Sequence, residues 1–259
     1  MQTVLFHSTI FGPIHSRRLG VSLGINLMPD NGKICSFDCL YCEAGFNAQG
    51  HGDGVIVPHE EVKRMLSEKL AAMHAENHPL DVITFSGNGE PTLHPDFDLV
   101  VDHTLALRDR FYPNARVSVL SNSTMAHRPR VRAALLRVDN NILKLDSAIT
   151  GTLRQINRPL APDFTAEHVI ETLAGYNGKL IVQTMMLSGE YDGKTFDNTT
   201  DTEIDALADA YRRIQPREVM LYSLDRETPA KTLTKIPIER LREIGQQIEQ
   251  ATGIKVQVN

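Results

Sequence analysis

The chain has 259 residues, of which 41% are hydrophobic and 23% charged, and its net charge is −5 at pH 7. This balance is typical of a globular protein and excludes a disordered chain, a coiled coil and a collagen-like fibre. There is no run of about 18 apolar residues and no signal-peptide pattern, so we expect no transmembrane helix and a cytoplasmic location. The negative net charge argues against electrostatic binding of nucleic acid over the whole surface.

Short apolar and β-branched runs alternate along the chain with segments of helical periodicity. Near-continuous apolar runs of this length are typical of parallel strands that are covered on both faces. The spacing predicts helices over 59–76, after Pro129, from Asp201 or Thr202 onward, and between Pro237 and Gly253. The predicted strands are 22–27, 82–85, 116–120, 141–145, 180–187 and 218–222, with an edge strand at 254–258.

Six strand-and-helix units in succession predict an α/β fold with a parallel sheet and right-handed crossovers. Six units are too few to close an ordinary eight-stranded barrel. We therefore expect a partial (β/α)6 barrel of the TIM type or an open doubly wound sheet, with the site at the carboxyl ends of the strands. We expect one domain over 1–259, with a loop at 28–58 and a C-terminal helix and edge strand at 237–259.

All three cysteines of the chain, Cys35, Cys39 and Cys42, lie within eight residues of the loop that follows the first predicted strand. An odd count in a cytosolic chain does not indicate a disulfide framework. Three thiolates this close repel one another unless a metal or an iron–sulfur cluster lies between them. Three cysteines can bind three irons of a 4Fe–4S cluster and leave the fourth iron open. The alternative is a zinc site in which His15, His51 or His59 is the fourth ligand.

The spacing Cys-x3-Cys-x2-Cys, with Tyr41 before the last cysteine, resembles the signature of the radical S-adenosylmethionine (SAM) enzymes. The resemblance implies a 4Fe–4S cluster on the three cysteines, whose open iron binds the amino and carboxylate groups of SAM beside Tyr41. It implies reductive cleavage of SAM to methionine and a 5′-deoxyadenosyl radical, which abstracts hydrogen from a substrate. The fold of that family, a partial (β/α)6 barrel, agrees with the strand count.

A second segment, Gly87-Asn88-Gly89-Glu90-Pro91, follows the second predicted strand and is similar to the Gly-Gly-Glu-Pro segment of the same family. Glycines let a backbone come close to a ligand, and a carboxylate can pair with an ammonium group. The resemblance implies that this segment contacts the amino group of SAM, although Asn88 departs from the family pattern. By turn chemistry alone, the segment is equally a tight turn.

Longer stretches narrow the resemblance to the Fe–S oxidoreductases related to the wyosine-synthesising tRNA enzymes. Those tRNA enzymes carry additional cysteines for a second cluster, whereas this chain has only three cysteines. The resemblance therefore does not imply the wyosine reaction. The stretches that carry it are 12–20, 22–27, 85–95, 144–146, 156–159 and 225–226.

The resemblance leaves the substrate open between a small molecule, a nucleoside and a protein. We expect SAM and a reductase such as flavodoxin or ferredoxin as partners, and no membrane. Alternative functions are activation of a glycyl-radical enzyme and modification of a tRNA base. A remoter alternative is a zinc-stabilised RNA-binding module that uses the seven arginines between Arg108 and Arg137. No aromatic residues are interleaved with these arginines in the way that nucleic-acid stacking requires.

Polar residues near the predicted strand ends complete the candidate site. Asn122, Asp146, Gln183 and Tyr222 are candidate SAM contacts, although Asn122 is equally a turn residue and Asp146 a helix N-cap. Arginine suits a carboxylate or phosphate, so arginines near the predicted mouth are candidate substrate contacts, with a solvated surface position as the alternative. The substrate candidates are Arg17, Arg18, Lys144, Arg154, Arg158 and Arg226.

Overall fold

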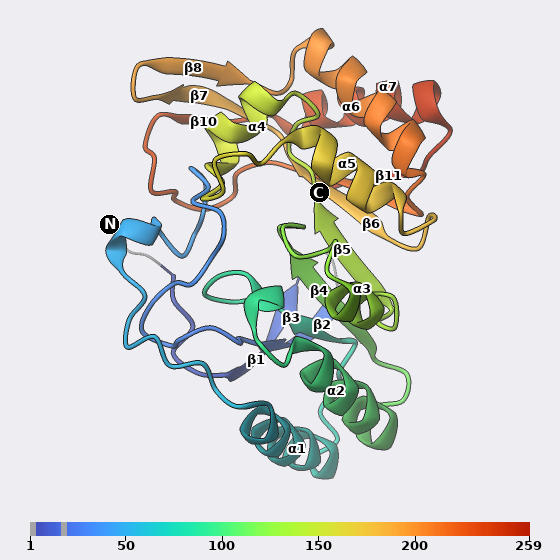
Figure 1. Ribbon diagram of the computed structural model, residues 1–259. Coiled ribbons are helices and arrows are strands. Elements are labelled where there is room, and N and C mark those ends of the chain that lie inside the picture. The colour runs from blue at the N-terminus through green and yellow to red at the C-terminus, as the bar shows by residue number, and fades with distance from the viewer. Residues whose placement is uncertain (1–3, 17–19) are drawn as a thin grey trace.

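Two sheets form the strand framework of the computed structural model, which describes residues 4–16 and 20–259 (Figure 1). The larger sheet has eight strands in the order β1-β2-β3-β4-β5-β6-β9-β11. β1 is antiparallel to β2, and the other neighbouring pairs are parallel. The bounds are Ile10–Ser16 (β1), Gly20–Ile25 (β2), Val82–Phe85 (β3), Arg116–Ser121 (β4), Asn140–Lys144 (β5), Ile181–Met185 (β6), Glu218–Tyr222 (β9) and Val256–Val258 (β11).

The six parallel strands from β2 to β9 lie where the apolar runs predict them, so the predicted α/β fold is confirmed. Within the described residues β1 and β11 do not pair with each other, and the sheet stays an open, partial barrel. The run at 180–187 was predicted as one strand, which is wrong. β6 ends at Met185, because the amide of Met186 bonds to the carbonyl of Tyr222 and Leu187 begins another strand.

The helices lie along the outer side of the sheet (Figure 1). Gly253 ends the last helix with a φ of 72°, as predicted, whereas Pro237 is its N-cap rather than its first residue. Thr200, not Asp201 or Thr202, caps the helix before it, because its hydroxyl accepts the amide of Glu203. The bounds are His59–Ala75 (α1), Phe97–Phe111 (α2), Pro129–Leu135 (α3), Thr150–Asn157 (α4), Ala166–Ala174 (α5), Asp201–Ile214 (α6) and Ile238–Thr252 (α7).

The buried apolar side chains form two separate clusters, one on each face of the large sheet. The larger cluster lies between the sheet and the helices and includes Leu143 and Val182, which are fully buried. The smaller cluster lies on the inner face and consists of Ile142, Ile181 and Met220, with Leu120 packed against it. Because side chains alternate along a strand, each strand contributes to both faces.

A smaller sheet, which the sequence did not predict, lies beside α4 (Figure 1). Its central strand is β7 (Leu187–Tyr191), which pairs antiparallel with β8 (Lys194–Asp197) and with β10 (Leu233–Lys235). No helix in the described part of the chain is long and apolar enough to span a bilayer.

Candidate active site

The cysteine loop is tied by backbone hydrogen bonds to the ends of two elements. The amide of Ile34 donates to the carbonyl of Asn88, and the amide of Glu90 donates to the carbonyl of Ile34, at 3.1 and 3.0 Å. Further along the loop, the amide of Leu40 donates to the carbonyl of Ile156 at 3.0 Å, near the end of α4. These bonds hold the loop against the carboxyl ends of the strands, where the parallel fold predicts the site.

Each of two cysteine sulfurs accepts a hydrogen bond from an asparagine of another element. Asn122 Nδ2 lies 3.6 Å from Cys35 Sγ, and Asn157 Nδ2 lies 3.5 Å from Cys39 Sγ. Burial, with the charges of Cys42 and Asp146, raises the pKa of the Cys39 thiol to about 11, and burial also raises the pKa of Cys35. The thiols of Cys35 and Cys39 are therefore protonated at neutral pH unless a cation lowers their pKa.

The three sulfurs are too far apart to share one zinc ion. Sulfur ligands of tetrahedral zinc lie about 3.8 Å apart, because each Zn–S bond is about 2.3 Å. Among the described residues, the only three His, Cys, Asp or Glu ligand atoms that all lie within 4.8 Å of one another belong to His59, Glu60 and His103. Within the residues that the structure describes, no histidine forms such a set with the cysteines, and His59, one of the predicted fourth ligands, belongs to that separate group. The donor set fits the three protein-bound irons of a 4Fe–4S cluster instead.

Lys33 is a buried cation beside the cysteines that sequence reasoning missed. Its ammonium group donates to the carbonyl of Gly45 at 2.8 Å and lies 3.7 Å from Asp38 Oδ1. Burial disfavours the ammonium, yet the sulfurs of Cys42, Cys35 and Cys39 outweigh burial and raise the pKa of Lys33. A fixed positive charge here offsets part of the negative charge that thiolates bring. Lys33 lies two residues before Cys35, and this nearness to the cysteine motif was the feature of the sequence that could have identified it.

The glycines of the 87–91 segment allow the close approach of two chain segments. A Cβ at Gly89 would lie 1.8 Å from the carbonyl oxygen of Ile34, so this backbone pairing requires glycine. Asn88 is fully buried, and its side chain bonds to the backbone of Phe6 and Pro29. Asn88, where the sequence departs from the family pattern, therefore has a structural role: its side chain joins the N-terminal segment to the site.

Glu90 is buried, and its carboxylate accepts hydrogen bonds from the chain itself. Oε2 accepts the amide of Asn122 at 2.6 Å, and Oε1 accepts the hydroxyl of Ser121 at 2.8 Å and both the amide and hydroxyl of Thr92. Burial raises the pKa of Glu90, although these bonds oppose the shift. Glu90 thus positions Asn122 beside Cys35, and the contacts of Glu90 and Pro91 with SAM stay predictions.

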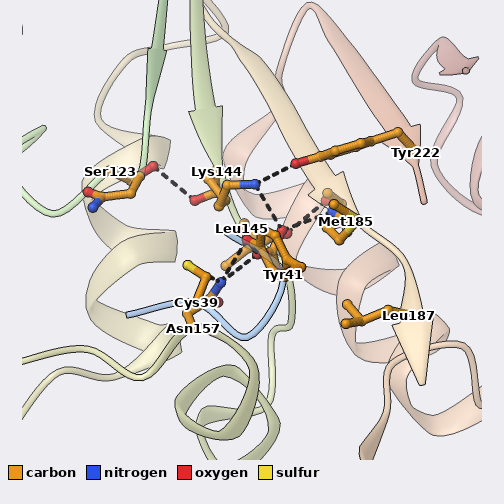
Figure 2. Close-up of polar contacts among 12 residues, drawn as sticks. Cys39, Tyr41, Ser123, Lys144, Leu145, Asn157, Met185, Leu187 and Tyr222 are labelled. Atoms are coloured by element: carbon orange, nitrogen blue, oxygen red, sulfur yellow. Dashed lines mark hydrogen bonds and ion pairs between the residues drawn. The ribbon is translucent and has the colours of Figure 1, made fainter. Parts of the chain in front are cut away.

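A buried network around Asp146 joins the cysteine loop to β6. Figure 2 shows Tyr41 and Met185, the two residues that the network joins. Asp146 Oδ2 accepts the hydroxyl of Tyr41 and Asn157 Nδ2, the latter at 2.6 Å, and Oδ1 accepts the amide of Met185 at 2.9 Å. Burial, with the charge of Asp146, raises the pKa of Tyr41 well above its ordinary value. The N-cap of α4 is Ile149, so the alternative of Asp146 as a helix cap is wrong.

Asn157 is the second residue whose role the sequence did not reveal. Its amide nitrogen lies within hydrogen-bond distance of Cys39 Sγ, the Tyr41 hydroxyl and Asp146 Oδ2. Its Oδ1 is buried and has no hydrogen-bond partner within residues 4–16 and 20–259. Asn157 therefore couples a predicted metal ligand to the polar network. Asn157 lies in the stretch 156–159, which carries part of the family resemblance, and this was the only feature of the sequence that pointed to the residue.

Lys144 and Tyr222 point toward each other from β5 and β9 (Figure 2). Lys144 Nζ donates to the Tyr222 hydroxyl at 2.8 Å and lies 3.5 Å from Asp146 Oδ1. Burial opposes the ammonium, but Asp146, Tyr222 and Cys39 together raise the pKa of Lys144. Lys144 thus remains charged on the inner face of the sheet and is already paired there.

A cavity of about 280 Å³ opens on the inner face of the sheet, beside the cysteine loop. Gln183 is 7% exposed, and in the described part of the chain its side-chain amide has no hydrogen-bond partner. A buried amide without a partner is costly, so it is suited to bind a ligand. Residues that line the cavity include Ile14, His15, Tyr41, Glu43, Leu120, Ile142, Gln183, Met185, Met220, Tyr222 and Arg226.

The six substrate candidates do not gather at one place. Arg17 and Arg18 lie outside the described residues, and Arg226, at the cavity, pairs with Glu43 at 2.6 Å. Arg154 donates to the backbone carbonyls of Pro162 and Phe164. Arg154 and Arg158 line a different pocket, beside β7 and β8. Arg158 also stacks between Phe46 and Tyr191 and lies 3.3 Å from Asp38.

Three of the seven arginines in the arginine-rich stretch pair with aspartates that lie outside it in the sequence. Arg108 pairs with Asp139 at 2.9 Å, Arg130 pairs with Asp98 at 2.9 Å, and Arg137 pairs with Asp102. Because these aspartates lie outside the stretch, its composition did not reveal that they neutralise part of its positive charge.

Comparison with known proteins identifies the family of the chain. A profile of the radical SAM superfamily matches residues 32–202. A UPF0026 protein of Helicobacter pylori (strain J99) is 28% identical over 227 residues, which cover 86% of this chain and 68% of that protein. UPF0026 protein slr1464 of Synechocystis is 31% identical over 227 residues, which cover 85% of this chain and 77% of that protein. UPF0026 protein MJ1312 of Methanocaldococcus jannaschii is 36% identical over 182 residues, which cover 68% of this chain and 53% of that protein.

Solved structures share the fold at low sequence identity. A radical SAM methyltransferase from Sphaerobacter thermophilus superposes with a TM-score of 0.65 at 17% identity, over 92% of this chain and 65% of that one. TYW1 with a lysine–pyruvate adduct bound gives a TM-score of 0.59 at 13% identity, over 90% of this chain and 74% of that one. With the profile match over most of the chain and the relative from Synechocystis, the chain belongs to the UPF0026 proteins within the radical SAM superfamily of enzymes, which bind a 4Fe–4S cluster and SAM.

Proposed function

We propose that this enzyme holds one 4Fe–4S cluster on Cys35, Cys39 and Cys42, cleaves SAM reductively and abstracts hydrogen from a substrate in the adjacent cavity. One observation carries the proposal. The nitrogen of Asn157 bonds at once to Cys39 Sγ and to the hydroxyl of Tyr41, which lines the cavity. The predicted cluster site and the cavity on the inner face of the sheet are thus neighbours.

When bound, the cluster supplies the electron that splits the sulfonium of SAM into methionine and a 5′-deoxyadenosyl radical. The chain prepares its surroundings with neutral and positive groups. Asn122 and Asn157 donate to two of the sulfurs, and the Lys33 ammonium adds a positive charge nearby. Hydrogen bonds to sulfur and nearby charge are known determinants of the potential of such clusters.

The cavity is the proposed place for SAM and the substrate. Gln183 offers a free amide to a ribose hydroxyl or a carboxylate, and Tyr222 offers a ring face for a base. The ion pair of Arg226 and Glu43 lies at the same cavity, and its charges suit a polar substrate. About 280 Å³ is a small space for a cofactor and a substrate together, so a small molecule or a single nucleoside suits it better than a folded macromolecule.

Several finer assignments belong to the same proposal. An oxidoreductase or transferase of this type needs an external one-electron donor, for which flavodoxin or ferredoxin is suitable. Three free thiols and the absence of a spanning helix in the described residues support a cytoplasmic location, where thiols stay reduced. The pairing of Arg108, Arg130 and Arg137 with aspartates weighs against an extended RNA surface.

The deciding experiment uses protein that is purified and reconstituted without oxygen. Iron and sulfide are counted, and SAM and dithionite are added while 5′-deoxyadenosine is followed. We expect about four irons per chain and slow release of 5′-deoxyadenosine. The Cys39→Ala variant should lose both, whereas Ser67→Ala on the outer helix α1 should keep both. Colourless protein that holds zinc, or a Cys39→Ala variant that still cleaves SAM, would contradict the proposal.

A further inference from the structure

Two histidines and one glutamate meet between α1 and α2, on the helical layer and away from the cysteine loop. His59 and Glu60 are the first two residues of α1, and His103 lies in the middle of α2. Nδ1 of His59 lies 3.2 Å from Nε2 of His103. Oε1 of Glu60 lies 3.7 Å from the first nitrogen and 3.5 Å from the second. Three ligand atoms from two helices thus form a nearly equilateral triangle.

The size of this triangle matches the coordination shell of a small divalent cation. A point equidistant from atoms separated by 3.2, 3.5 and 3.7 Å lies about 2.0 Å from each of them, in their plane. Zinc binds imidazole nitrogen at about 2.0–2.1 Å and carboxylate oxygen at about 2.0–2.2 Å. An ion placed there, or slightly out of the plane, reaches all three atoms without movement of either helix.

The surroundings orient the ligands without occupying their shared centre. The Lys63 ammonium binds the other carboxylate oxygen, Oε2 of Glu60, at 3.2 Å and leaves Oε1 turned toward the imidazoles. The rings of His59 and His103 are stacked with an angle of 19° between their planes, and both side chains are about one-quarter exposed or less. Asp102 is nearby but pairs with Arg137.

We propose that His59, Glu60 and His103 bind one divalent transition-metal ion, of which zinc suits the donor set best, with the fourth position open to water. The ion would clamp the start of α1 to the middle of α2. Its role is structural, since the site lies on the outer helices. The proposal does not depend on the cysteines or on SAM cleavage.

The test uses anaerobic protein whose cysteines are already occupied by the reconstituted cluster, so that added zinc cannot bind them. Zinc chloride is titrated by calorimetry, and melting is followed with and without zinc. We expect one zinc per chain and a higher melting temperature with zinc. His103→Ala should weaken zinc binding by more than about 100-fold, beyond the loss that an outer-shell partner causes. His78→Ala, at another exposed His–Glu pair near the end of α1, should bind zinc like the wild type.

A second measurement identifies the ligands and guards against a misfolded variant. X-ray absorption at the zinc edge should show only nitrogen and oxygen neighbours in the wild type. If His103→Ala loses its cluster or its cooperative melting, His59→Gln is used instead, with the same expected loss of affinity. Sulfur in the zinc shell, equal affinity in a folded variant and the wild type, or no zinc binding at all would each overturn the proposal.

Discussion

On β5 and β6 the two faces of the large sheet differ in chemistry although they share the same backbone. Leu143 and Val182, which face the helices, are fully buried in the large apolar cluster. Their neighbours Lys144 and Gln183, which pair in register on the inner face, are polar and lie at or near the cavity. The inner face also carries apolar side chains, at Ile142 and Ile181 deeper in the barrel and at Met185 at the end of β6.

This difference separates stability from chemistry along a single strand. The outer face gains free energy by excluding water, and any well-packed aliphatic side chain can do that. The inner face near the strand ends keeps polar groups that are paired with one another or left available for a ligand. Substitutions on the two faces should therefore affect different properties, and the following changes test this separation.

Leu143→Ala should have the largest effect on stability. It leaves a cavity in the closely packed outer layer, so the free energy of unfolding should fall by about 2–5 kcal/mol. Urea denaturation of the cluster-free protein measures this loss. A loss below about 1 kcal/mol would mean that the outer layer is loosely packed and would blur the contrast between the faces.

Tyr41→Phe should have a smaller but still clear effect. It removes the hydroxyl that donates to Asp146 and accepts from Asn157, and it leaves buried polar groups short of a partner. The expected loss of stability is about 1–3 kcal/mol. The same urea titration measures it, and Phe164→Leu, a conservative change elsewhere in the core, serves as the reference for apolar repacking.

Gln183→Ala should affect ligand binding rather than folding. Because the side-chain amide has no partner among the described residues, its removal should change the unfolding free energy by less than about 0.5 kcal/mol. Loss of one ligand hydrogen bond should weaken SAM binding by about tenfold, or about 1.4 kcal/mol. Equilibrium binding of SAM to the reconstituted protein measures this change. Unchanged affinity together with lower stability would reverse the assignment of the two faces.

His94 should make the protein sensitive to mild acid. Burial lowers its pKa below the ordinary value of 6.5, although the carbonyl of Val57 opposes this shift. The unfolded chain therefore takes up a proton first, and stability falls as the pH drops below 6.5, by up to about 1.4 kcal/mol per pH unit until His94 itself is protonated. Melting temperatures between pH 7.5 and 5.5, with a chelator present, should decline less in His94→Gln. An equal decline would assign the effect to other groups.

Arg130→Ala should have the smallest effect. The Arg130 side chain is exposed and pairs with Asp98 on the outer surface, where ion pairs contribute about 0–1 kcal/mol. Melting temperature and affinity for a tRNA mixture should both stay near those of the wild type. A marked loss of RNA affinity would revive the RNA-binding alternative that the paired aspartates argue against.

Local pattern was sufficient for much of the fold. Short apolar runs marked the six parallel strands, because strands covered on both faces need few polar residues. The hairpin strand β1 and the small sheet were missed, since β1, β7, β8 and β10 contain exposed positions and lack the continuous apolar runs of the buried strands. β10 also pairs with β7 across a long stretch of sequence, with Leu233 opposite Gly189. The helices α2, α4 and α5 were also missed, whereas the shorter helix α3 was predicted from the proline at its start.

The sequence by itself determined the cysteine spacing, the glycines that accept a close backbone and the positions of the six parallel strands along the chain. Each of these depends on residue type and short-range spacing. Only the tertiary structure decided which polar groups meet: Lys33 beside the sulfurs, Asn157 between Cys39 and Asp146, and His59 against His103. Asn157 and His103 lie 118 and 44 residues from Cys39 and His59, and local pattern carries no information over such distances. Packing brings these residues together because the elements that carry them share a buried face.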